Sequence, residues 1–152
     1  MRKSYFVVWV FLPFIYSSCS TGPQPINYGS DACSFCQMTI VDNQHAAQLV
    51  TEKGKNYKYD AIECMINDLR KWKRPPVKTH LVADYSNPGM LTDALTASYL
   101  ITEKIPSPMG ANLSAFSSES GRNETHQSMG GDKLNWEQLR LRWGKNQTHN
   151  HH

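Results

Sequence analysis

The sequence predicts an α+β protein built from two tandem β-β-α-β half-domains, at residues 31–85 and 86–140. The first observation behind this prediction is an internal repeat. Segment 46–53 (AAQLVTEK) recurs as segment 97–104 (ASYLITEK), with five of eight residues identical. The second is that the turn, helix and strand signals after the two copies come in the same order. Together these observations indicate a duplicated unit.

The elements of the first half-domain follow from local signals. Apolar residues alternate with Thr and Glu in segment 46–53, which favours a strand, and Asp60 is a suitable N-cap for a helix. Gly-Lys between two strand-like runs favours a hairpin turn. In order, the expected elements are strand 46–53, a turn at 54–55, strand 55–59, helix 61–69 and strand 79–85.

The second half-domain shows the same order with weaker signals. Ser117 or Ser118 is the expected N-cap of a polar helix, and Gly130-Gly131 ends that helix. In order, the expected elements are strand 97–103, strand 113–116, a helix from 117 or 118 to 129, and strand 133–136.

The N-terminal segment has the features of an export signal. A basic start precedes an apolar run over residues 5–16, which is too short to cross a bilayer as a helix. Small residues directly before Cys19 resemble a bacterial lipobox. We therefore expect residues 1–18 to be a lipoprotein signal peptide that is removed, and Cys19 to carry the lipid. The alternative is ordinary signal cleavage with Cys19 left as a spare thiol.

The two ends of the mature chain are expected to be flexible. Residues 19–30 have few large apolar side chains and are predicted to form a tether. Residues 141–152, which contain Asn and His, are predicted to form a tail outside the folded unit. The expected location is the cell envelope, with the lipid anchor in the membrane and the domain facing the periplasm.

Charge and motifs exclude several functional classes. The whole chain has 16 Lys and Arg residues against 13 Asp and Glu, and removal of residues 1–18 would leave a formal charge of +1. This balance, together with the expected lack of any basic block interleaved with aromatic residues, predicts no nucleic-acid partner. The signatures Gly-x-Ser-x-Gly and His-Glu-x-x-His are missing, so the protein is not expected to be an enzyme.

A cluster of sulfur donors is the main functional signal. Cys33-x-x-Cys36-x-Met38 contains two thiols and a thioether, and such soft donors favour Cu(I), Zn(II) and iron–sulfur clusters. Of these, Cu(I) makes the best use of methionine. If Cys19 carries lipid, three thiols remain, and an odd number in an oxidising compartment leaves at least one outside any internal disulfide. A Cys33–Cys36 disulfide with Cys64 buried is the alternative.

Several segments together carry a family resemblance. They are Cys-x-x-Cys-x-Met, the strand Ala-Ala-Gln-Leu-Val, the run Gly-Lys-Asn-Tyr-Lys-Tyr-Asp, a cysteine at the start of a helix, and Ser-Pro-Met-Gly at 107–110. In combination they look like the NosL family, over a stretch from Cys19 to Leu139. The chain departs from the family at Gln37, where the family usually has Gly.

The resemblance implies a function and partners. NosL proteins are exported copper lipoproteins, so it implies binding of Cu(I) and its delivery to the copper–sulfide centre of nitrous oxide reductase. It also implies work alongside an ABC-type maturation complex, and a fold of two β-β-α-β half-domains.

The expected copper ligands are Cys36, Met38 and Met109, with Cys33 as the next candidate. Met38 lies two residues after Cys36, so the two side chains share a face of an extended segment. Met109 lies in a Pro-Met-Gly loop, and a loop favours an exposed donor over a core residue. Cys64 is expected to be a small apolar core residue, and gap-filling in a core is the alternative for both methionines.

The histidines are not expected to join this site. His45 and His80 are predicted to be structural or merely exposed, and the terminal histidines are predicted to belong to a solvated tail.

Two other uses of the cysteines stay open. One is a thiol–disulfide protein that uses Cys33 and Cys36, although no helix start or βαβ order follows Cys33. The other is a structural zinc domain with four ligands, formed by three cysteines and a histidine. The duplicated unit also resembles the fold of organomercury lyase, which is an argument from fold alone.

Overall fold

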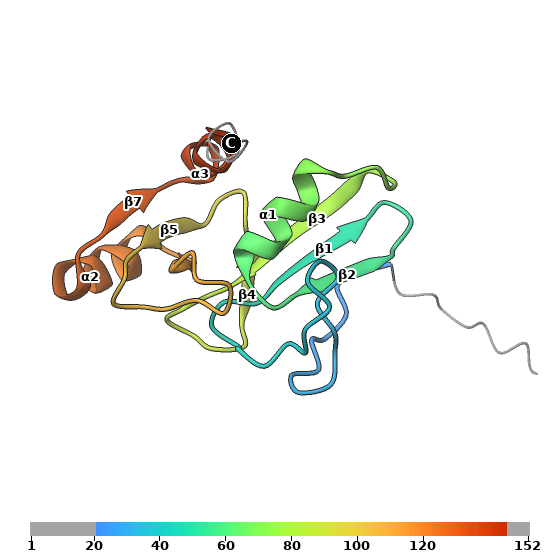
Figure 1. The fold of residues 1–152 in the computed structure, drawn as a ribbon, viewed down its shortest axis with the longest axis horizontal. Helices are drawn as coiled ribbons and strands as arrows, with labels where there is room; N and C mark the ends of the chain where they lie inside the picture. Colours follow the sequence, from blue (N-terminus) through green and yellow to red (C-terminus); the bar gives the residue numbers. More distant parts are fainter. Residues whose placement is uncertain (1–20, 146–152) are drawn as a thin grey trace, which may run out of the picture.

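The computed structural model of the protein describes residues 21–145 (Figure 1). The expected signal peptide at 1–18, the expected acylation site Cys19 and the terminal histidines lie outside the described residues. Between residues 21 and 145, no helix combines the length and the apolar composition that a bilayer-spanning helix needs.

The described chain contains strands and helices in the order expected for a duplicated unit, with two additions. In sequence they are β1 (Ala47–Thr51), β2 (Asn56–Tyr59), α1 (Ile62–Arg70), β3 (Val77–Ala83), β4 (Leu91–Asp93), β5 (Ser98–Ile101), β6 (Leu113–Phe116), α2 (Glu119–Met129), β7 (Asp132–Leu134) and α3 (Trp136–Lys145). The additions are β4 and α3, which the sequence analysis did not predict.

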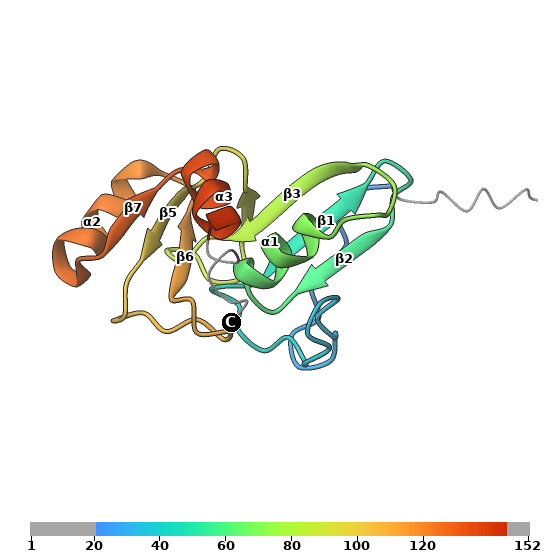
Figure 2. The same cartoon turned by 45° about the horizontal axis from the view of Figure 1, so that its top comes forward.

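The two sheets share one arrangement, which confirms the predicted α+β duplication. Both are antiparallel, with strand orders β2-β1-β3-β4 and β6-β5-β7. Strands β1 and β5 lie within the two copies of the repeat, and each strand is paired on both sides. Figure 2 shows the two units side by side, with α3 next to α1.

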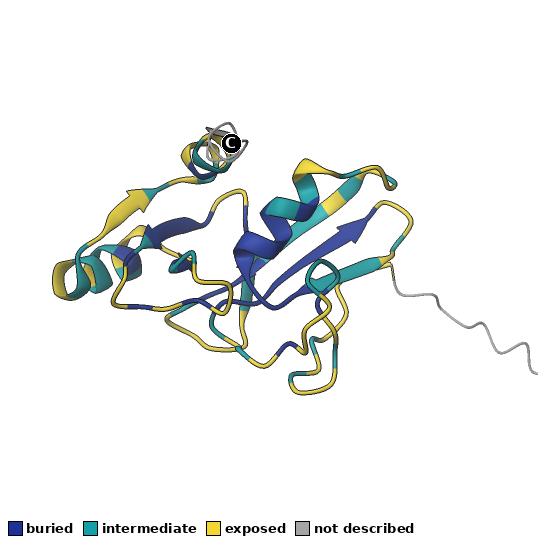
Figure 3. Ribbon diagram, viewed as in Figure 1, coloured by how far each residue is buried: buried dark blue, intermediate teal, exposed yellow. Residues whose placement is uncertain are grey.

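Helix α1 lies in the centre of the core. Ile62, Met65 and Ile66 recur at helical spacing, are almost fully buried, and belong to a helix that packs on β1 and β2. Figure 3 shows how strongly the buried residues concentrate in α1 and β1. The predicted N-cap is wrong: Ala61 occupies that position. The carboxylate of Asp60 instead accepts a hydrogen bond from the Val41 N–H at 3.2 Å.

The two later helices begin at side-chain caps. Ser118 caps α2 as predicted, because its Oγ accepts a hydrogen bond from the Gly121 N–H at 3.2 Å. Before α3, Asn135 and Gln138 exchange two hydrogen bonds of 2.9 Å, each from a backbone N–H to the other's side-chain oxygen. This reciprocal capping box is visible in the sequence as Asn-x-x-Gln, a signal that the sequence analysis missed.

Both predicted flexible ends are partly ordered in the structure. Within the predicted tether 19–30, Ile26 and Tyr28 pack against the core, and the Gln24 N–H donates to Asn56 Oδ1 at 3.0 Å. At the other end, α3 continues to Lys145, so the first five residues of the predicted tail 141–152 are helical. Two apolar side chains and several hydrogen bonds hold a segment whose average composition favoured a tether.

Polar contacts join the two half-domains. Asp84 and Ala115 form an isolated parallel bridge, and the Ser117 hydroxyl donates to Asp84 Oδ2 at 2.7 Å. His45 Nδ1 lies 2.9 Å from an Asp42 carboxylate oxygen, and its Nε2 lies 3.2 Å from Ser114 Oγ. His45 is therefore structural, as expected, and it connects residues of the first and second units.

Candidate metal centre

A tight loop carries the first two cysteines. The Cys33 N–H donates to the Met38 carbonyl at 2.7 Å, and the Gln37 N–H donates to the Cys33 carbonyl at 3.0 Å. The Ser34 N–H donates to the Lys58 carbonyl at 2.7 Å, which attaches the loop to β2. Closing this turn requires a left-handed backbone at Gln37, with φ of 65°. That conformation favours glycine, the residue that the resemblance described above gives for this position.

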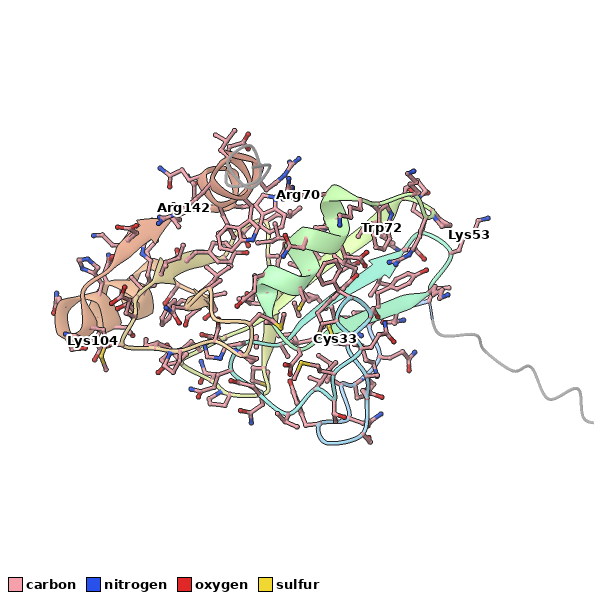
Figure 4. The ribbon with its side chains drawn as sticks, viewed as in Figure 1. Cys33, Lys53, Arg70, Trp72, Lys104 and Arg142 are labelled. Carbon is pink, nitrogen blue, oxygen red and sulfur yellow. The ribbon has the colours of Figure 1, made fainter. Side chains whose placement is uncertain are left out.

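Helix α1 brings a third thiol to this loop. The Sγ atoms of Cys33, Cys36 and Cys64 all lie within 4.8 Å of one another. Cys64 is in the first turn of α1, where its N–H donates to the Ala61 carbonyl. Figure 4 shows Cys33 and its neighbouring sulfur atoms below the helix, in the middle of the molecule. The three thiols are free, so the structure has no Cys33–Cys36 disulfide.

The three thiols differ in exposure. Cys33 and Cys64 are buried, whereas Cys36 is partly exposed. An ion that arrives from solvent therefore meets Cys36 first. The sequence analysis expected Cys64 to be a small core residue; it is buried, but it also belongs to the thiol cluster.

Hydrogen bonds polarise the cluster. The Cys64 thiol donates a hydrogen bond to the Cys33 sulfur, and backbone N–H groups, including that of Cys36, donate further ones. These hydrogen bonds outweigh the opposing effect of burial and lower the pKa of Cys33 to about 5. The same bond to Cys33, together with burial, raises the pKa of Cys64. Burial also raises the pKa of Cys36. Cys33 is thus the most acidic of the three thiols, and the hydrogen bond within the pair favours a thiolate at Cys33 and a proton on Cys64.

The donor set suits a soft metal ion. Two sulfurs bound to one ion at about 2.3 Å lie at most about 4.6 Å apart, so only a small adjustment is needed here. Among the residues that the structure describes, no histidine, aspartate or glutamate joins the three thiols within the same 4.8 Å limit. A four-ligand zinc site made of three cysteines and a histidine therefore lacks its fourth member in this part of the chain.

The two candidate methionines lie at the surface. The Met38 side chain is 57% exposed and directly follows the cysteine loop, and the Met109 side chain is 41% exposed, in the loop between β5 and β6. Exposed thioethers beside a buried thiol pair are available to an incoming ion or to a partner protein.

Glu63 holds the Met109 loop against the start of α1. This residue precedes Cys64 and is almost fully buried. Its Oε1 accepts hydrogen bonds from the Ser107 hydroxyl and from the Ala111 N–H at 3.3 Å. The second half-domain thereby places its Pro-Met-Gly loop beside the helix turn that carries a cluster thiol. The sequence analysis missed this contact, because nothing local links residues 63 and 107.

His80, the other histidine expected to be structural, does not belong to the thiol cluster. Burial lowers the pKa of His80, and its ring lies 6.1 Å from that of Trp136, edge to face. Its role is structural, as expected for a histidine on a strand.

The comparisons with known proteins agree with this geometry. A sequence model of the NosL family matches residues 25–143. The chain belongs to the NosL family. The match covers both half-domains and every described cysteine, so the expected family is confirmed.

A solved NosL structure has the same fold. The crystal structure of the copper chaperone NosL from Shewanella denitrificans superposes with a TM-score of 0.66 at 19% identity, and the alignment covers 77% of this chain and 94% of that one. No protein with curated annotation matches the sequence. Gln37, which has the left-handed backbone in the cysteine loop, is the position at which this chain departs from the pattern given above.

Proposed function

We propose that this protein is a copper chaperone that binds one Cu(I) ion at the surface of the thiol cluster. The proposed ligands are Cys36, Met38 and Met109, with Cys33 as the next thiolate. The observation that carries the proposal is the group of three free thiols within 4.8 Å, next to exposed methionines and without a described histidine or carboxylate in the group. Such a set favours Cu(I) over zinc. The copper chaperone of similar fold supports it.

The exposure gradient fits delivery of the ion. Cys36 and the two methionines are accessible, so a partner's sulfur ligand enters the coordination shell before the first ligand leaves. The buried Cys33 and Cys64 then stay behind as a hydrogen-bonded pair. We propose no catalytic turnover: the protein binds and releases the ion without chemical change.

The proposed recipient is nitrous oxide reductase, for assembly of its copper–sulfide centre, together with an ABC-type maturation complex. This step rests on the family resemblance of the motifs described above. We also propose that the protein is exported and anchored in the membrane of the cell envelope by acylated Cys19, facing the periplasm. A lipid anchor would raise the effective concentration of the chaperone near membrane-bound partners.

A Cu(I) titration with a competing chelator tests the binding site. The reduced protein is expected to take up one Cu(I), and Met109→Leu is expected to weaken binding at least about tenfold, because it removes the thioether but keeps the volume. Met90→Leu is the matched control, since Met90 is 65% exposed and precedes β4. Equal affinities for both variants, or the absence of a one-to-one complex, would refute the assignment.

A thiol–disulfide function is the second candidate. Its supporting observation is the lowered Cys33 pKa of about 5, since the thiolate is the reactive form. Against it, Cys33 is fully buried and its loop precedes a strand instead of a helix. Reduction of a model disulfide by the metal-free protein, abolished by Cys33→Ser, would favour this candidate over copper transfer.

A further inference from the structure

One end of the first half-domain is strongly basic. Lys53 and Lys55 lie in and beside the β1–β2 turn, residues 70–74 (RKWKR) end α1 and lead toward β3, and Lys78 lies in β3. The seven cationic side chains are exposed. Figure 4 shows Lys53 and Trp72 toward the right-hand end of the molecule, Arg70 nearer to α3, and Lys104 far away in the second half-domain. We call this set the basic end. Residues 70–74 place four basic side chains around Trp72, so the expectation that the chain lacks a basic block interleaved with aromatic residues was wrong.

The basic end is a fixed surface. The Glu52 N–H donates to the Pro76 carbonyl at 3.0 Å, which ties the β1–β2 turn to the loop after α1. The Trp72 indole N–H donates to the Pro75 carbonyl at 3.0 Å, and the Arg74 guanidinium lies 4.7 Å from the Trp72 ring centroid. Trp72 therefore packs inward and shapes the loop, so that its basic neighbours point to solvent.

Few acidic groups balance this charge. Of the seven cations, only Arg74 is in an ion pair among residues 21–145, at 2.6 Å from Asp68. Glu52 is the other acidic residue within these segments. Seven positive and two negative side chains give a formal +5. Residues 19–152 carry +1 in all, so the rest of the mature chain carries −4. The molecule is electrostatically polarised, and the basic end is its positive pole.

Residues 21 and 22, which follow the expected lipidation site, lie at the same end. A Cβ placed on Gly54, in the β1–β2 turn, would lie 3.1 Å from the Cα of Thr21. The Asn56 side-chain amide donates to the Gly22 carbonyl at 3.2 Å, so residues 21 and 22 lie along that turn. Cys19 is two residues earlier and hence within about 7 Å of chain from Thr21. An acyl chain on Cys19 would enter the bilayer beside the basic end.

We propose that the basic end docks on a membrane surface through anionic phospholipid headgroups. Clustered lysines and arginines are attracted to anionic lipids, and a basic patch next to an acyl chain supplies a second membrane contact. The proposal builds on the envelope location given above, although the surface itself does not require the acyl chain.

This docking orients the chaperone. Cys64 is six residues before Arg70 in α1, so it lies about 9 Å along the helix axis from Arg70. With residues 70–74 on the membrane, the thiol cluster is raised above the headgroups. The partly exposed Cys36 and the exposed Met38 and Met109 then stay accessible to protein partners.

Vesicle sedimentation of the unacylated mature chain tests the proposal. The protein is residues 19–152 with Cys19→Ser, which keeps every described element. It is expected to bind vesicles of equal parts phosphatidylglycerol and phosphatidylcholine, and to lose binding at high salt. Lys71→Gln with Lys73→Gln should lower the partition coefficient about tenfold or more. The control pair is Lys104→Gln with Lys133→Gln, which removes the same charge at exposed sites outside the basic end. This pair should lower the partition coefficient less than about twofold.

Three results would overturn the proposal. They are equal binding to vesicles of phosphatidylcholine alone, equal losses in the two variant pairs, and equally tight, salt-sensitive retention of a single-stranded oligonucleotide. Met109→Leu is expected to bind vesicles like the parent chain. A failure of the copper site therefore leaves the lipid result intact, and the two proposals fail separately.

Discussion

Replacing Gln37 by glycine should stabilise the protein. Gln37 has φ of 65°, a conformation that costs an ordinary L-residue about 1 kcal/mol or more and costs glycine nothing. The side chain is exposed, and its one hydrogen bond, to the Ser34 carbonyl, is long at 3.4 Å. The greater freedom of glycine in the unfolded chain offsets part of the gain. We expect a net increase of about 0.5 to 1 kcal/mol in the free energy of unfolding.

Thermal and urea denaturation of the metal-free, reduced protein measure this effect. For a domain of this size, about 1 kcal/mol corresponds to a rise of about 4 °C in Tm. Asn112→Gly is the matched control: Asn112 has φ of 56°, but asparagine tolerates this region better, so the gain should be smaller. Gln37→Val should destabilise, because a branched side chain fits this backbone worst. A loss of stability in Gln37→Gly would refute the strain argument.

Three further predictions concern buried polar contacts. Ser107→Ala removes a donor to the buried Glu63 carboxylate and should lower the free energy of unfolding by about 1 to 3 kcal/mol in urea titration; an unchanged value would show that the contact is weak. Tyr59→Phe removes the hydroxyl that donates to Asp68 at 2.7 Å and should cost about 1 to 2 kcal/mol by the same assay. Burial raises the Asp84 pKa, but side-chain and backbone hydrogen bonds outweigh it and lower the pKa overall. The ionised Asp84 therefore stabilises the fold above about pH 4, and this stabilisation is lost as pH falls through the lowered pKa. The difference in the free energy of unfolding between the parent and Asp84→Asn should narrow in acid. A difference that widens in acid would contradict the direction of the pKa shift.

The sequence predicted the elements whose signals are local. Alternating apolar residues placed β1 and β5 correctly, and the Ser118 cap of α2 was found because Ser is a strong N-cap residue. The cap of α1 was missed because Asp60 is engaged by Val41. Helix α3 was also missed, although its Asn-x-x-Gln capping box was present.

Sequence reasoning proposed the four sulfur ligands but missed the third thiol of the cluster and the contact that positions the Met109 loop. Cys33, Cys36 and Met38 are neighbours along the chain, so their association was evident. Cys64 joins them only when α1 folds back onto the cysteine loop, a contact between residues about thirty positions apart that no local pattern specifies. The hydrogen bonds that Glu63 accepts from the Met109 loop join the two half-domains, and they too depend on tertiary packing.

X-ray absorption at the copper edge of the reduced, Cu(I)-loaded protein tests the proposed function most directly. The account predicts two or three sulfur neighbours with no nitrogen or oxygen ligand, and one sulfur fewer in Met109→Leu with no such loss in Met90→Leu. A shell that contains nitrogen or oxygen, or one that is unchanged when Met109 is replaced, would contradict the proposed ligand set.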